Sequence, residues 1–123
     1  QEDIPPLTAT GYATDPIVFQ RMTGSTTNPN IRGLRLEGVS YITIDGIDVS
    51  SASTAYDIQP SSTDACYDIT IKNCNITNAS SSGINFDSSG TWYGSVIQNN
   101  TLHNCATAIS LSNSFNAIID GMT

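Results

Sequence analysis

The chain is poor in positive charge. Of its 123 residues only four are basic, Arg21, Arg32, Arg35 and Lys72, against eleven acidic residues, and the formal net charge is −7. Four cations cannot neutralise a run of phosphates, and we therefore expect no nucleic-acid partner. The same imbalance disfavours an anionic membrane surface.

Long apolar runs are also missing. No segment approaches the roughly 18 consecutive apolar residues of a transmembrane helix, so we expect no membrane insertion. The first residues, Gln1, Glu2 and Asp3, are not followed by the apolar run of a signal peptide. For a secreted protein, we therefore expect this sequence to be a processed form or a part of a longer polypeptide.

Charged residues (12%) and apolar residues (38%) are both scarce, and Ser, Thr, Asn and Gly are abundant instead. This composition suits many short strands joined by tight turns, whereas disordered chains usually carry more charge and fewer β-branched residues. The three cysteines, Cys66, Cys74 and Cys105, match no zinc-binding spacing. We expect Cys74 to be a small interior residue, and the sequence leaves open one disulfide among the three.

A short phrase of apolar and polar residues recurs down the chain. It reads Ile-Asp-Gly-Ile-Asp-Val at residues 44–49, Ile-Lys-Asn-Cys-Asn-Ile at 71–76 and Ile-Gln-Asn-Asn-Thr-Leu at 97–102, and it begins again at residue 119. The first isoleucines of the four copies are separated by 27, 26 and 22 positions. A period in the twenties built from short strands is typical of a solenoid, in which each coil buries its apolar face against its neighbours.

Three short parallel strands are expected in each coil. The expected first strands are 41–44, 68–71 and 95–97, the second 47–49, 74–76 and 100–102, and the third 55–59, 83–86 and 108–111. The sequence therefore predicts an all-β, right-handed parallel β-helix of about four to five coils in a single unit. Residues 1–37 would form lead-in strands and a loop, and residues 38–123 the regular coils. A β-sandwich also has many short strands, but it does not explain the recurrence at matching coil positions.

Stacking turns these repeats into columns that run along the solenoid. Ile44, Ile71, Ile97 and Ile119 are expected to form an inner aliphatic column. At the corner that follows, Asn73 and Asn99 are expected to lie one above the other, with their amides bonded along the axis as in stacked strands. Cys74 takes the interior place that Ile47 holds in the preceding copy.

Two segments carry a resemblance to a known group of proteins. Residues 7–20, Leu-Thr-Ala-Thr-Gly-Tyr-Ala-Thr-Asp-Pro-Ile-Val-Phe-Gln, and residues 41–48, Tyr-Ile-Thr-Ile-Asp-Gly-Ile-Asp, resemble the pectate-lyase-like β-helix regions of very large secreted and surface proteins of Bacteroidota. The resemblance implies export to the cell surface or the medium, and a role as an adhesin, a surface-layer part or a polysaccharide-handling module.

The sequence stops in the middle of a repeat, so we expect a segment of a longer helix. Exposed strand edges at the ends of such a stack would allow end-to-end self-association into filaments.

Catalysis is the first alternative to a structural role, because pectin- and alginate-acting enzymes use this fold. A lyase would need a cation held by clustered acids and a base with a shifted pKa. Asp45 and Asp48 lie on one coil and Lys72 on the next, which makes them the strongest, though weak, candidates. An aspartate beside a corner glycine is also ordinary turn chemistry, and a solvated outer face is the favoured interpretation. His103 stands alone and is expected at the surface.

Calcium is the cofactor that the sequence leaves open. Asp57, Asp64, Asp68 and Asp87 lie near expected loops, and oxygen-rich loops of acidic secreted proteins often bind Ca²⁺. No EF-hand loop and no Gly-Gly-x-Gly-x-Asp repeat is present, so a metal-free chain is the simpler expectation.

A glycan is the ligand that the aromatic residues would fit. Trp92 and Tyr93 are expected in a loop between Gly90 and Gly94, which makes Trp92 the best candidate for stacking on a sugar, although capping a coil edge is the simpler role. The leading hypothesis is a secreted or cell-surface structural rod without catalysis in this segment. The alternatives are a fragment of a polysaccharide lyase or glycoside hydrolase, and a carbohydrate-binding module.

Overall fold

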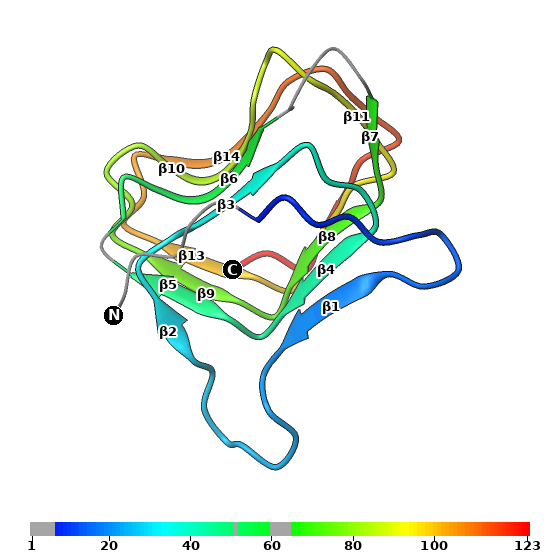
Figure 1. The fold of residues 1–123 in the computed structure, drawn as a ribbon. Coiled ribbons are helices and arrows are strands. Elements are labelled where there is room, and N and C mark those ends of the chain that lie inside the picture. The colour runs from blue at the N-terminus through cyan, green and yellow to red at the C-terminus, as the bar shows by residue number, and fades with distance from the viewer. Residues whose placement is uncertain (1–6, 51, 60–64) are drawn as a thin grey trace.

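The computed structural model describes residues 7–50, 52–59 and 65–123, and these residues form a parallel β-solenoid of about four turns. Every pairing between its described strands is parallel. In Figure 1 the strands of successive turns stack into sheets around one closed interior. Among the described residues, no helix is long or apolar enough to span a bilayer.

Four sheets make up the walls. The first has the order β1 (Ile17–Gln20), β4 (Ile42–Asp45), β8 (Ile69–Lys72), β12 (Val96–Gln98) and β16 (Ile118–Asp120). The second has the order β2 (Asn30–Ile31), β5 (Asp48–Ser50), β9 (Asn75–Thr77) and β13 (Thr101–His103). The third has the order β3 (Leu34–Glu37), β6 (Thr54–Gln59), β10 (Ser82–Phe86) and β14 (Thr107–Leu111). The fourth has the order β7 (Ala65–Tyr67), β11 (Thr91–Tyr93) and β15 (Ser114–Phe115).

The prediction of three strands per coil is therefore incomplete, because the fourth sheet was missed. The three expected sets of strands are present, but the first two sets begin one residue later than expected. In the first set the shift at two strands arises because Tyr41 and Asp68, expected at their starts, have φ angles of 57° and 51° and form a corner instead. Residues in this left-handed region break a strand and turn the chain.

The inner aliphatic column is present as expected. Ile44 pairs with Ile71, Ile71 with Ile97, and Ile97 with Ile119. The first three are buried, whereas Ile119 is half exposed because no described residue covers it. Burial of each isoleucine stabilises the stack by roughly 1.5–3 kcal/mol, so this column contributes to holding adjacent coils together.

The corner after this sheet is made by one left-handed residue per turn. Gly46, Asn73, Asn99 and Gly121 have φ angles of 70°, 56°, 54° and 63°. Each of the first three donates its backbone N–H to the next coil, as Gly46 does to Lys72 O at 3.0 Å. Glycine and asparagine are the residues that adopt this conformation most readily, which explains why they recur here.

Candidate functional site

One corner of the solenoid departs from the repeat. Between β4 and β5 the chain turns with two residues, 46–47, and the same corner takes two residues in the following turns, 73–74 and 99–100. Between β1 and β2, however, the connection has nine residues (21–29), seven more than at the equivalent corners. Figure 1 shows this insertion loop projecting from the corner, away from the stacked walls. An insertion in one repeat of a solenoid often marks its binding face.

The insertion loop has a fixed internal structure. Ser25 N–H donates to Met22 O at 3.0 Å, which closes a β-turn, and Gly24 at its third position has a φ of 87°. A positive φ at that position is the requirement of a type II turn and selects glycine. Ser25 Oγ then donates to Thr27 O at 2.8 Å. These bonds hold the loop in one conformation.

The base of the insertion loop is tied to two coils of the stack. Arg21 donates through Nη1 to Asn28 Oδ1 at 3.2 Å, which closes the loop across its base. Asn28 Nδ2 lies 2.8 Å from Asp48 Oδ1 and 3.2 Å from Asn73 O, so this one amide contacts two successive coils. These bonds therefore anchor the base of the projecting loop to the corner column.

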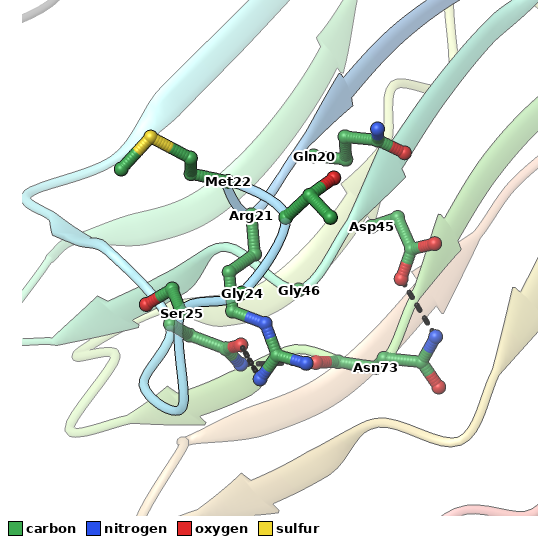
Figure 2. A pocket seen from close by; sticks show the side chains of 10 residues that line it. Gln20, Arg21, Met22, Gly24, Ser25, Asp45, Gly46 and Asn73 are labelled. Carbon is green, nitrogen blue, oxygen red and sulfur yellow. Dashed lines mark hydrogen bonds between the residues drawn. The ribbon is translucent and has the colours of Figure 1, made fainter.

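A groove of about 470 Å³ lies between the insertion loop and the corner. Its walls are residues 20–25 and Asn28 on the loop side, and Asp45, Gly46 and Asn73 on the corner side. Figure 2 shows the Asp45 carboxylate bonded to the Asn73 amide on the corner side, and the Arg21 side chain extending from the loop. We call this space the corner groove. It is the site around which the expected catalytic residues lie.

Asp45, Asp48 and Lys72 are all engaged in bonds that hold coils together. Asp45 accepts from Asn73 Nδ2 at 2.6 Å and lies 3.5 Å from Lys72 Nζ. Asp48 Oδ1 accepts from the Asn28 amide and, at 2.7 Å, from the backbone N–H of Asn75. Each carboxylate thus bonds to the following coil. These contacts give the three residues a structural role that accounts for their positions.

Other charged residues that could take part in acid–base chemistry lie elsewhere. Asp120 is separated from Asp45 by two rungs, occupied by Lys72 and Gln98. Glu37 belongs to another sheet. His103 is exposed on β13. The structure therefore does not gather these carboxylates and the histidine at the corner groove.

Asn73 and Asn99 occupy equivalent corners of successive turns as expected, but the side-chain amide of Asn73 bonds to an aspartate. Asn73 N–H donates to Gln98 O at 3.1 Å along the axis, while its side chain donates to Asp45 rather than to Asn99. A side-chain ladder of the expected kind is present at a different corner, where Asn104 Nδ2 donates to Asn78 Oδ1 at 2.7 Å. These two residues also have left-handed backbones.

The prediction that Trp92 contacts a glycan is wrong, because the indole is only 1% exposed. Trp92 lies in β11 rather than in a loop, and its side chain points into the core. Its ring packs edge-on against Phe86 with centroids 5.4 Å apart, and its Nε1–H donates to Asp87 O at 3.1 Å. A buried indole with its one donor satisfied is a core residue.

Tyr93 belongs to an aromatic stack on the outside of the solenoid. Tyr41, Tyr67, Tyr93 and Phe115 follow one another with centroids 6.4, 5.5 and 5.2 Å apart and interplanar angles of 13–20°. Both faces of the Tyr93 ring are therefore covered by neighbouring rings. Sugars stack on ring faces, so the stack leaves Tyr93 only its edge for such a contact. The period of 26, 26 and 22 residues between these aromatics is the signal that could have revealed the fourth sheet.

The described calcium candidates do not converge. Asp57 accepts from the amides of Asn85 and Gln59, at 3.0 and 2.9 Å, on the wall formed by β6 and β10. Asp87 accepts from the hydroxyl and the N–H of Ser89, and these bonds lower the pKa of its carboxyl. Asp68 lies at another corner, beside Gly94.

Asp64 falls outside the described residues. Within the described part of the chain, no three His, Cys, Asp or Glu side chains are grouped to hold a metal ion.

The interior of the corner column holds the cysteine and one unexpected polar residue. Cys74 is buried as expected, and this burial raises the pKa of its thiol. In the next turn Asn100 takes the same place and is completely buried. Its amide donates to Ile71 O at 2.9 Å and accepts from Cys74 N–H at 2.9 Å. The sequence placed Asn100 at the start of an expected strand, in line with Cys74, but a polar side chain at that position did not predict a buried amide. The structure joins no two of Cys66, Cys74 and Cys105 by a disulfide, so the bond left open by the sequence is not formed.

Comparison with known protein families gives one match. Residues 21–123 match the model of the right-handed β-helix region. Comparisons with curated proteins and with solved structures each gave no match. The match covers most of the sequence and agrees with the parallel, stacked sheets described above, so the chain belongs to the right-handed β-helix family.

Proposed function

We propose that this chain is a rigid structural segment of a secreted or cell-surface protein, acting as an adhesin-like rod, and that it carries no catalysis of its own. The observation that carries the proposal is the engagement of Asp45, Asp48 and Lys72 in bonds between coils. An acid–base residue must exchange protons with a substrate, whereas these side chains act as fixed links in a stack.

The regularity of the walls supports the same role. The inner isoleucine column, the corner residues and the exterior aromatic stack each continue through successive turns in register. Because each coil contacts only its neighbours, such a stack has the same cross-section along its length and can be extended by further coils. A uniform rod suits a spacer or a fibre better than a single reaction centre.

End-to-end self-association is part of this proposal. One end of the stack has an apolar hollow of about 170 Å³, lined by Leu7, Phe19, Pro29, Ile31, Leu34 and Ile47. At the other end, Ile118 and Ile119 of β16 are half exposed. Burying such faces against each other would remove apolar surface from water and pair the edge strands. Analytical ultracentrifugation that compares the oligomeric state of the wild-type chain with that of Ile119→Asp tests this contact. If both sediment as monomers, the contact is excluded.

The proposed cell-surface or secreted location is tested with an antibody raised against this chain. We expect labelling of intact source cells, or recovery of the protein from the medium, and thin unbranched rods in negative-stain micrographs of the native protein. Recovery only from the cell interior would refute the surface role.

A fragment of a polysaccharide lyase or glycoside hydrolase is the competing function. Incubation of the native protein with pectin, alginate and neutral polysaccharides tests it, with release of unsaturated or reducing ends as the measured quantity. Release that persists in the purified 123-residue chain and is lost in Asp45→Asn would replace the structural role with a catalytic one.

A further inference from the structure

The corner groove is the one place where the uniform stack gains a separate wall. The insertion loop makes that wall, and the two-residue corners of the following turns have none. Its volume, about 470 Å³, lies within the range of small-ligand sites. Loops on a rigid scaffold carry binding functions disproportionately often.

We propose that the corner groove binds one uncharged sugar ring of a glycan. This inference goes beyond the structural role and does not depend on it. It also assigns glycan contact to a different place from Trp92, which was the best glycan-contact candidate in the sequence.

The polar groups of the groove match hydroxyl groups. Gln20 presents an amide with both donor and acceptor atoms, and Thr23 presents a hydroxyl. Asn73 keeps its amide oxygen and one of its two N–H donors beside the bond to Asp45, and the Ser25 hydroxyl, which donates to Thr27 O, can still accept. A sugar hydroxyl is itself both donor and acceptor, so it can bond to either half of each amide. Met22 at the rim is 79% exposed and offers a flexible apolar surface for the C–H face of a ring.

The charges of the groove cancel. Among the described residues that line it, Arg21 is the cation and Asp45 is the anion. Both already have partners within the protein, Asn28 for Arg21 and Lys72 with Asn73 for Asp45. A charged ligand would therefore meet no surplus of opposite charge, and its desolvation would go uncompensated. This balance favours a neutral ligand over a uronate or an amino sugar.

The groove is formed before any ligand arrives. The turn at Met22 and Ser25, the bond between Arg21 and Asn28, and the contacts of Asn28 with two coils hold both walls in place. Binding then costs little loop ordering, which is the usual obstacle to recognition by a surface loop.

Titration of the ¹⁵N-labelled chain with methyl glycosides tests the proposal. The probes are the neutral methyl glucoside, galactoside and mannoside, with methyl glucuronide and methyl glucosaminide as charged comparators. For about a dozen non-hydrogen atoms, ordinary ligand efficiency gives a dissociation constant of roughly 2 mM. We expect at least one neutral glycoside to shift amide signals of residues 20–28, 45–46 and 73, and the charged comparators to bind more weakly.

The repeat supplies matched control variants. Gln20→Ala and Asn73→Gly remove groove side chains, and glycine is already present at the Asn73 corner in two other turns. Gln98→Ala and Asn99→Gly make the same changes at equivalent positions outside the groove. Each groove variant should weaken binding about five- to tenfold, the value of one hydrogen bond, and each control should leave it unchanged.

Three results would overturn the proposal. The first is the absence of shifts at glycoside concentrations well above the expected dissociation constant. The second is equal weakening by the groove variants and their controls. The third is binding of the charged comparators alone, which would show a charge-selective site rather than a neutral-sugar site.

Discussion

The buried amide of Asn100 makes a quantitative test of how the coils are held together. Asn100→Ala removes the acceptor of the Cys74 N–H and the donor to Ile71 O. A buried donor left without a partner costs about 1–3 kcal/mol, and the second lost bond costs about 1 kcal/mol. We therefore expect the free energy of unfolding to fall by about 2–4 kcal/mol, a large part of the 5–15 kcal/mol of a typical domain.

Urea unfolding followed by circular dichroism measures this change. With a slope of about 2 kcal/mol per molar urea, the midpoint should fall by about 1–2 M. The control is Asn99→Gly, because Asn99 is exposed, is adjacent in sequence and has a backbone that glycine adopts freely. The control should change stability by less than about 1 kcal/mol. If Asn100→Ala costs no more than Asn99→Gly, the buried amide does not support the corner and the reasoning is wrong.

Three further predictions concern packing, thiol reactivity and pH. Gly83→Ala should lower stability by about 1–3 kcal/mol in thermal unfolding, because its Cβ would lie 2.7 Å from a backbone carbonyl oxygen of the next coil; an unchanged melting temperature would contradict that contact. Ellman's reagent should label half-buried Cys105 before Cys74, whose thiol is buried and has a raised pKa, and labelling in the reverse order would contradict the assigned burial. Bonds from Ser89 lower the pKa of the Asp87 carboxyl in the folded state. Their stabilisation is therefore present above the pKa that Asp87 has in the unfolded chain, and it is lost as the pH falls through the pKa of the folded state. Ser89→Ala should raise the folded-state pKa of Asp87 in a carboxyl NMR titration, and an unmoved pKa would exclude the bond.

The sequence was sufficient to predict the repeat and the residues that fill its interior. Isoleucines at intervals of 27, 26 and 22 residues predicted one inner column, and the structure pairs them in that order. This part was predictable because a solenoid repeats its local pattern, so the same residue types recur at equivalent positions of each coil. The fourth sheet was missed because its strands share little besides an aromatic residue, as at Tyr67 and Tyr93.

The candidate site was harder to predict from the sequence. Residues 23–29 read as a polar loop, but nothing in their order showed that Asn28 would bond to Asn73, 45 positions away. Trp92 was misplaced for a related reason, since neighbouring glycines suggested a loop while the tertiary packing places its ring in the core against Phe86.

The sequence by itself determined the solenoid, its period, its inner aliphatic column and the glycine and asparagine corners, because each follows from residue types repeated at a fixed spacing. The tertiary structure alone decided which polar side chains link the coils and which line a groove. Asp45 and Asp48 look alike in the sequence as corner acids, yet each is bonded by a different distant amide. The physical reason is that hydrogen-bond partners across a corner depend on how the coils stack and on where the base of the insertion loop is anchored, and a local sequence pattern encodes neither.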